Sequence, residues 1–202
     1  MKVALIGATG QVGSRLLSEL TRRGHTITAI VRDPAKAPRG PLVVAGRGDV
    51  NDKAGLAASL RGHDAVISSV RFLDSDPAAL VGAVRAAGVK RYLVVGGAGS
   101  LEVAPGVTLL STPQFPAAYK QEATRGAEFL AYLRRVGDVD WTFLSPSALF
   151  FAGERTGKFR LGKDQLLTNE NGSSISFEDF AVALVDELER PAHVRERFTV
   201  GY

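Results

Sequence analysis

The chain has 202 residues, of which 45% are hydrophobic and 23% charged. This length and composition predict one globular domain over residues 1–202 and exclude a disordered chain. It contains no cysteine, which excludes disulfides, thiol nucleophiles and thiolate metal sites, so redox chemistry would need a bound cofactor.

The net charge of +4 comes from basic residues scattered along the chain, with no dense basic stretch. We therefore expect no nucleic-acid partner. No apolar run reaches the roughly 20 residues of a membrane helix, and Met1-Lys2 leads straight into an apolar run. We expect a cytoplasmic monomer or homodimer with a small-molecule partner. No spaced pattern of His and carboxylate residues indicates a metal site.

The first apolar run, Lys2–Ile6, is followed by the glycine-rich segment GATGQVG and then by a helical pattern over residues 14–23. Gly7 permits a sharp exit from the strand, Gly10 lets backbone N–H groups approach a pyrophosphate, and Gly13 lets the helix pack closely. Phosphates favour such a helix N-terminus. The segment therefore predicts a dinucleotide site, with contacts from Gly7, Thr9, Gly10, Gln11, Val12 and Gly13.

Further strands and helices alternate along the chain. Strands are expected at residues 26–31, 42–45, 65–70, 91–95, 141–144 and 197–200, and helices at 51–60, 77–87, 119–135 and 178–189. A long irregular stretch separates residue 100 from residue 118. This alternation predicts an α/β fold, a Rossmann-like doubly wound parallel sheet with a small C-terminal extension. Residues from about 146 on are expected to form part of the substrate side.

Ligands of such sheets bind beyond the C-terminal ends of the strands, so the residues that follow each strand should meet at one edge. Asp49 is expected to accept from the adenine amine while Val50 packs on the ring; alternatively, Asp49 only caps the next helix. The cofactor contacts expected beyond the glycine turn are Arg32, Asp49, Val50, Ser68, Ser69, Val70, Gly96, Gly97 and Pro146.

Arg32 stands where NAD-binding proteins usually carry an acidic residue, about 20 residues past the glycines. A guanidinium pairs with a 2′-phosphate that a carboxylate would repel. The sequence therefore favours NADP(H) over NAD(H). In the alternative interpretation, Arg32 is a solvated loop cation and Asp33 turns inward to hold the ribose hydroxyls.

Together these motifs resemble the short-chain dehydrogenase/reductase superfamily, in its atypical, NmrA-like and biliverdin/flavin-reductase branch. The resemblance is carried by the glycine turn, Val31-Arg32-Asp33-Pro34, Gly48-Asp49-Val50 and the segment Gly96–Ser100. The C-terminal half is similar to bacterial proteins described as NADH-flavin reductase-like, through Phe115-Pro116-Ala117, Asp140-Trp141-Thr142-Phe143, Ser145-Pro146 and Gly153–Gly157.

The resemblance implies a catalytic Ser after the fifth strand and a Tyr-x-x-x-Lys helix. Tyr119 stands in the Tyr place, but the residue four further on is Ala123, and Lys120 lies on a different helix face. Ala98 occupies the Ser place, with Ser100 close by. This departure argues against alcohol dehydrogenation, which needs a proton relay. Tyr119 is left as a candidate proton donor or ribose contact.

Flavin reduction depends mainly on stacking two rings, because the flavin product can exchange its proton with water. Phe115, Phe150 and Phe151, together with Tyr119, are predicted to form a platform for FMN or FAD as the acceptor. The alternative is that these rings pack against the core.

Three functions follow from these residues. The leading hypothesis is an NADPH-dependent oxidoreductase that delivers hydride to a flavin or a similar planar acceptor. The second is an NmrA-like redox sensor, which binds the dinucleotide without turnover. The third is an NAD(P)-dependent epimerase or dehydratase, against which the missing Tyr-x-x-x-Lys argues.

Overall fold

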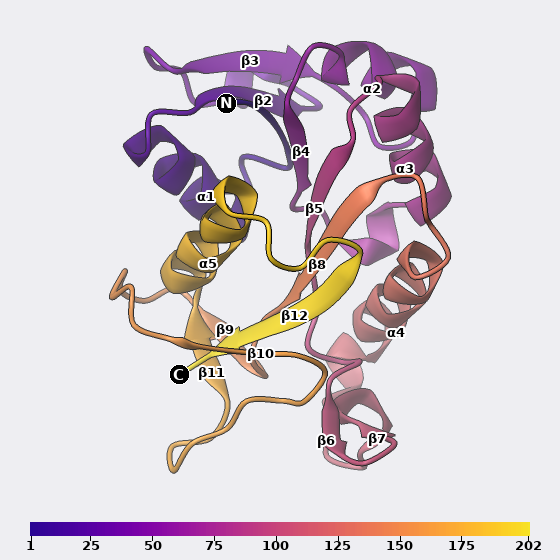
Figure 1. The fold of residues 1–202 in the computed structure, drawn as a ribbon, viewed down its shortest axis with the longest axis vertical. Helices are drawn as coiled ribbons and strands as arrows, with labels where there is room; N and C mark the ends of the chain where they lie inside the picture. The colour runs from indigo at the N-terminus through magenta and orange to yellow at the C-terminus, as the bar shows by residue number, and fades with distance from the viewer.

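The computed structural model describes residues 1–202 and has an eight-stranded sheet at its centre (Figure 1). The strand order is β10-β12-β8-β5-β4-β1-β2-β3. These strands are β1 (Lys2–Ile6), β2 (Thr26–Val31), β3 (Val43–Arg47), β4 (Ala65–Ser68), β5 (Arg91–Val95), β8 (Asp140–Ser145), β10 (Arg160–Gly162) and β12 (Glu196–Gly201). All neighbours are parallel except β10, which runs antiparallel to β12. The predicted Rossmann-like, doubly wound fold is confirmed.

The chain reverses its direction of growth across the sheet at β1. Leu5 lies opposite Ala29 of β2 on one side and opposite Ile67 of β4 on the other. In open α/β sheets, the crevice at this switch point, beyond the carboxyl ends of the strands, is where ligands bind. The residues that follow β1, β2 and β4 are therefore placed to line one site.

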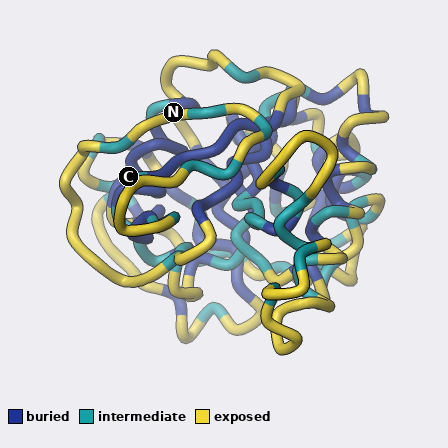
Figure 2. The backbone as a smooth tube through the Cα atoms, turned by 90° about the horizontal axis from the view of Figure 1, so that it is seen from below, coloured by how far each residue is buried: buried dark blue, intermediate teal, exposed yellow.

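Helices cover both faces of the sheet (Figure 1). One face carries α1 (Gln11–Arg22) and α5 (Phe177–Glu189), and the other carries α2 (Lys53–Leu60), α3 (Pro77–Ala86) and α4 (Ala117–Leu133). The first face holds a core cluster of 24 buried residues and the second a cluster of 22. Because both faces are buried almost equally, the strands are apolar on both sides, as the sequence indicates. Figure 2 shows buried segments in the interior and exposed segments around them.

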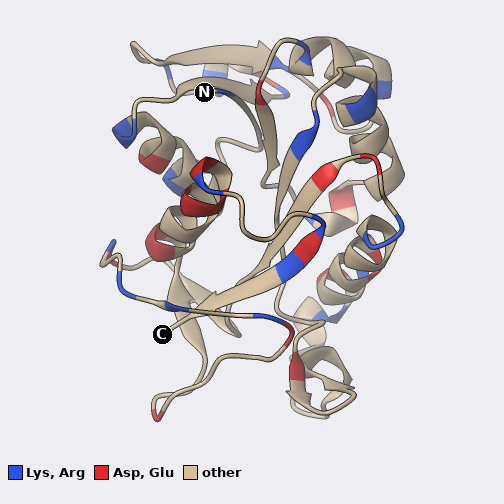
Figure 3. Cartoon of the chain, in the orientation of Figure 1, with Lys and Arg blue, Asp and Glu red and all other residues tan.

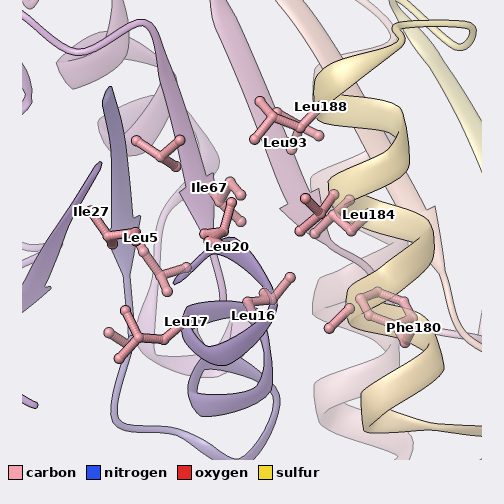
Figure 4. Packing of buried hydrophobic residues seen from close by; sticks show 14 of the residues in the cluster. Leu5, Leu16, Leu17, Leu20, Ile27, Ile67, Leu93, Phe180, Leu184 and Leu188 are labelled. Carbon is pink, nitrogen blue, oxygen red and sulfur yellow. The ribbon is translucent and has the colours of Figure 1, made fainter. Parts of the chain in front are cut away.

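The packing of α1 and α5 over the sheet follows their hydrophobic spacing. Leu16, Leu17 and Leu20 form one side of α1, while Phe180, Leu184 and Leu188 recur every four residues along α5 (Figure 4). A four-residue interval keeps side chains on one face of a helix. Each fully buried leucine contributes roughly 2 kcal/mol of transfer free energy, so this seam holds both helices firmly against the sheet.

Two small sheets lie beyond the main one. β9 (Leu149–Phe151) pairs in parallel with β11 (Ser174–Ser176). β6 (Glu102–Ala104) and β7 (Val107–Thr108) form a hairpin, where the sequence predicts an irregular stretch. The turn of this hairpin contains Gly106 with a φ of +73°, a conformation that glycine adopts without steric cost.

Short 3-10 helices complete the loops: η1 (Pro34–Lys36), η2 (Phe72–Asp74) and η3 (Leu109–Ser111). None of the helices combines the length and the apolar character that crossing a membrane requires.

Candidate functional site

The glycine turn after β1 is held in place by two close backbone approaches. Gly7 has a φ of +82°, and a Cβ placed on it would lie 2.2 Å from the carbonyl oxygen of Ser69. A Cβ on Gly13 would lie 2.0 Å from the carbonyl oxygen of Gly7. Side chains at these two positions would clash with backbone, so both glycines are required by the fold itself.

Gly10 differs from the other two glycines because a side chain there would not clash with the backbone. A Cβ there would meet its nearest atom, the Gly7 carbonyl oxygen, only at 3.4 Å, which is an ordinary contact. Gly10 has extended backbone and starts α1 without any capping side chain. α1 begins at Gln11, three residues earlier than the sequence predicts, because Gly10 C=O already accepts a helical hydrogen bond from Ser14 N–H. The space beside Gly10 is therefore open to a ligand.

The first turn of α1 directs free donors into that space. Ser14 N–H donates to Gly10 C=O at 2.9 Å, whereas the N–H groups of Gln11, Val12 and Gly13 find no acceptor in the chain. The turn carries no acidic residue. Unpaired N–H groups at the positive end of a helix form an anion site. This geometry suits a pyrophosphate.

At the end of β2 the structure separates the roles of two neighbours. Asp33 Oδ1 accepts from Ala35 N–H at 3.1 Å and caps η1, and its other oxygen lies 3.9 Å from Lys36 Nζ. Arg32 is exposed and makes no hydrogen bond or ion pair within the chain. The carboxylate of Asp33 is thus committed to its own turn, and the guanidinium of Arg32 is free for a ligand.

Asp49 and Val50 follow β3. Asp49 Oδ1 accepts from Asn51 N–H at 2.9 Å, while the cap of α2 is Asp52, which accepts from Gly55 N–H at 3.0 Å. Asp49 is therefore not the helix cap that the alternative interpretation makes it. Val50 is half-buried against the second core cluster.

The three residues after Ile67 differ in how deeply they are buried. The Ser68 hydroxyl is buried and lies 2.8 Å from the Tyr92 hydroxyl, and burial raises the pKa of Tyr92. Ser68 therefore faces the core, and its side chain is not available to a cofactor. Ser69 donates its N–H to Ile6 C=O at 2.9 Å, and Ser69 and Val70 stand half-buried beside the glycine turn.

The exits of β5 and β8 pack tightly against each other. Gly96 N–H donates to Leu144 C=O at 2.8 Å, and a Cβ on Gly96 would lie 2.5 Å from that oxygen. Gly97 lies over the ring of Phe72, which a Cβ on Gly97 would meet at 3.7 Å. Pro146 is buried. The backbone of these residues lines the carboxyl ends of β5 and β8.

Tyr119 lies in the first turn of α4 with 67% of its surface exposed. At the position four residues on, where the family pattern has Lys, Ala123 packs against the β5 exit: a Cβ on Gly99 would lie 2.9 Å from the Ala123 Cβ. A side chain at position 99 would therefore meet Ala123. Position 123, one turn beyond Tyr119 on the same helix face, thus carries no cation.

The predicted aromatic platform divides into buried and exposed rings. Phe150 packs edge-on against Phe177 with ring centroids 4.6 Å apart, and its centroid lies 4.9 Å from that of Phe180. Phe151 is 37% exposed, and Phe115 is half-buried. Successive strand residues face opposite sides, so Phe150 supports the core whereas Phe151 faces outward.

A strap over residues 152–158, which follows β9, was not predicted to be held by specific contacts. Gly153 N–H donates to Glu178 Oε2 at 2.9 Å, and Arg155 Nε donates to Glu19 Oε2 at 2.7 Å. Asp179, fully buried, accepts from Thr156 N–H and from Gly157 N–H, both at 2.8 Å. Glu178 and Asp179, at the start of α5, thus accept the hydrogen bonds that hold the backbone of the strap. The partners are up to 136 residues apart in sequence, and no local pattern reveals them.

A family model described as NAD(P)H-binding matches residues 7–191. The chain is 40% identical to a Bacillus subtilis protein named uncharacterized protein YwnB, over 99% of this chain and 98% of that protein. It is 26% identical to an NAD(P)H azoreductase of Xenophilus azovorans, over 98% of this chain and 67% of that protein.

Solved structures match over the whole chain. A Bacteroides thetaiotaomicron protein provisionally named an epimerase is 41% identical with a TM-score of 0.93, covering 100% of this chain and 96% of that one. A Streptococcus pneumoniae protein provisionally named an NADH-flavin reductase is 37% identical with a TM-score of 0.84, covering 100% and 99%.

A Burkholderia pseudomallei protein provisionally named an exported protein is 46% identical with a TM-score of 0.90, covering 100% of both chains. The cytoplasmic location expected from the sequence therefore stays a prediction.

Proposed function

Because the chain belongs to the NAD(P)H-binding family of atypical, NmrA-like short-chain dehydrogenases/reductases, we propose that this oxidoreductase-type protein passes a hydride from NADPH to a flavin or a similar planar acceptor. The observation that carries the proposal is the first turn of α1, whose N–H groups at Gln11, Val12 and Gly13 are unpaired and face open space beside Gly10.

The residues at this edge fit the nucleotide. A Cβ at Gly10 would project into the space beside the free N–H groups, where a diphosphate would sit. Arg32, exposed and without a partner, would pair with the 2′-phosphate. When bound, NADPH supplies the hydride. The chain's own residues hold and orient it.

The acceptor side favours a substrate that needs little help with protons. Ala123 in the Lys place leaves Tyr119 without the neighbour that would make it a strong relay. A flavin needs mainly to be stacked in position, with its proton taken from Tyr119 or from water. Phe151, Phe115 and Tyr119 would provide the rings. The names of the Streptococcus and Xenophilus relatives, which refer to flavin and azo acceptors, support this class.

A redox sensor of the NmrA type is the second candidate. The specific observation in its favour is that Tyr119 is largely exposed and Ala123 replaces the Lys, so the usual catalytic pair is missing while the nucleotide side is intact. A sensor would bind NADPH and change a partner's state without consuming the nucleotide.

Steady-state oxidation of NADPH with FMN, followed at the nicotinamide absorbance band, tests the proposal. We expect FMN-dependent oxidation that Phe151→Ala weakens through a higher KM for FMN, whereas Phe150→Ala mainly lowers thermal stability because its ring supports the core. Arg61→Ala, at an exposed cation that closes α2, is the matched control and should change neither. NADPH binding without oxidation would favour the sensor, and the absence of binding would refute both.

A further inference from the structure

The loop after β4 is held from a different helix. Arg71, at the N-cap of η2, makes no capping bond with its side chain, which is 67% exposed. Instead, Glu122 of α4 takes both available donors: its Oε1 accepts from Phe72 N–H at 2.7 Å and its Oε2 from Leu73 N–H at 3.0 Å. A carboxylate bound to two successive N–H groups is a strong, geometrically specific contact. Glu122 thus caps η2 from outside its own segment.

The same face of α4 receives the ring of Phe72. Phe72 is 8% exposed, and its centroid lies 5.3 Å from Phe129 and 6.0 Å from Phe143. A Cβ on Gly126 would lie 3.0 Å from the Phe72 ring. Glu122, Gly126 and Phe129 follow each other at intervals of four and three residues, so they share one helix face. The Glu122 carboxylate, the missing side chain at Gly126 and the Phe129 ring together hold η2 against α4.

The opposite end of this loop forms a wall of the glycine turn. Ser69 N–H donates to Ile6 C=O at 2.9 Å, and the Val70 Cγ1 would lie 3.2 Å from a Cβ on Gly7. Only Arg71 separates this wall from the N–H groups that Glu122 holds. Tyr119 lies three residues before Glu122, one turn away on α4. Glu122 therefore joins the wall of the nucleotide site to the helix that carries the candidate proton donor.

We propose that Glu122 is a positioning residue for the nucleotide site. Its carboxylate holds the segment Ser69–Leu73 against α4, keeping the wall beside the glycine turn in its binding position. Without it, the N–H groups of Phe72 and Leu73 lose their acceptors, and the segment must shift to reach water or another acceptor. The role rests on the proposed binding of NADPH at the glycine turn.

Two substitutions at Glu122 test this. Glu122→Ala removes both acceptor oxygens, and Glu122→Gln keeps one. We expect the Kd and KM for NADPH to rise about tenfold in Glu122→Ala and about threefold in Glu122→Gln, with kcat at saturating NADPH within about twofold of wild type, because Glu122 acts on binding and touches no reacting atom. Glu128→Ala is the matched control: on the same helix, its side chain is 57% exposed and pairs only with Arg125, so it should change none of these values.

Two further measurements separate positioning from general loosening. Amide hydrogen exchange should show Phe72 and Leu73 N–H protected in the wild type and unprotected in Glu122→Ala. Val89→Ala, a buried position just after α3, should lower the melting temperature without raising the KM for NADPH.

An unchanged Kd in Glu122→Ala, or an equal rise in Val89→Ala, would overturn the role of Glu122 alone. A wild type that binds neither NADPH nor NADH would overturn the proposed function and, with it, this role.

Discussion

The two ends of α1 differ in whether their polar groups are paired within the chain. In the seam between α1 and α5, Glu19 is 3% exposed and accepts from Arg23 Nε at 2.8 Å and from Arg155 Nε at 2.7 Å. Arg23 also pairs with Asp186 at 2.7 Å, and Figure 3 shows acidic and basic residues side by side on these helices. At the N-terminal end of the same helix, the first-turn N–H groups have no acceptor, and Arg32, which follows β2, has no counter-ion.

The comparison shows where the chain uses polar groups for its own stability. A buried charge costs free energy unless it is paired, and Glu19 is paired with both Arg23 and Arg155. Exposed donors at the strand exits cost nothing to leave solvated, and they stay available to an anion. Substitutions in the seam should therefore change stability, and substitutions at the exits that cause no backbone clash should change binding.

The largest effect is expected at Gly13. A Cβ there would lie 2.0 Å from the Gly7 carbonyl oxygen, so Gly13→Ala should lower the free energy of unfolding by about 3 kcal/mol. Gly10→Ala meets no clash and should leave stability within about 0.5 kcal/mol while abolishing NADPH binding. Urea denaturation and nucleotide titration of both variants measure the contrast. Equal stability losses would contradict the distinction between the two glycines.

The second effect is expected at Glu19. Glu19→Ala leaves Arg23 and Arg155 without their shared carboxylate and should cost about 2–3 kcal/mol of unfolding free energy, because both arginines keep some access to water. NADPH affinity should not change, since Glu19 lies two turns beyond the anion site. Chemical denaturation measures the loss. A variant as stable as the wild type would show that the seam is not held by these ion pairs.

Acid pH should weaken the same seam. The hydrogen bond from Arg155 is the largest cause that lowers the pKa of Glu19 from 4.5 to about 2. Between these values the unfolded chain binds the proton and the folded chain does not, so stability falls as the pH falls. The urea concentration at the unfolding midpoint of the wild type should fall as the pH is lowered from about 4.5 to about 2. In Glu19→Gln this fall should be smaller. Parallel acid profiles for the two proteins would contradict the assignment.

A smaller effect is expected at Tyr119, because the side chain is 67% exposed. Tyr119→Phe should leave stability and the Kd for NADPH unchanged and lower kcat with FMN about tenfold, since water can replace part of the proton donation. Steady-state kinetics with NADPH and FMN measure this. An unaltered kcat would remove Tyr119 from the proton path.

The sequence predicts the sheet well because its strands are buried on both faces. Lys2–Ile6, Thr26–Val31 and Arg91–Val95 are strands over the predicted residues, since a near-continuous apolar run has few other structures available. The hairpin of β6 and β7 was missed because Val103 and Val107 are exposed, and its short strands have no buried face to give an alternating pattern.

The candidate site could be predicted only where one segment carries the signal. The glycine turn and Arg32 depend on local spacing, so they could be named from the sequence, and their cofactor roles stay predictions. The contact of Glu122 with Phe72 joins residues 50 apart, and that of Arg155 with Glu19 joins residues 136 apart. Such contacts depend on how the helices meet, which no local pattern contains.

The most direct test of the account is calorimetric titration of the wild type, Arg32→Ala and Arg61→Ala with NADPH and with NADH. We predict that the wild type binds NADPH more tightly than NADH. Arg32→Ala should weaken NADPH about 10- to 30-fold, as expected for one lost charge-assisted contact, leave NADH unchanged and keep the melting temperature. Equal binding of NADPH by all three proteins would contradict the claim that the unpaired donors at the strand exits exist to bind this nucleotide.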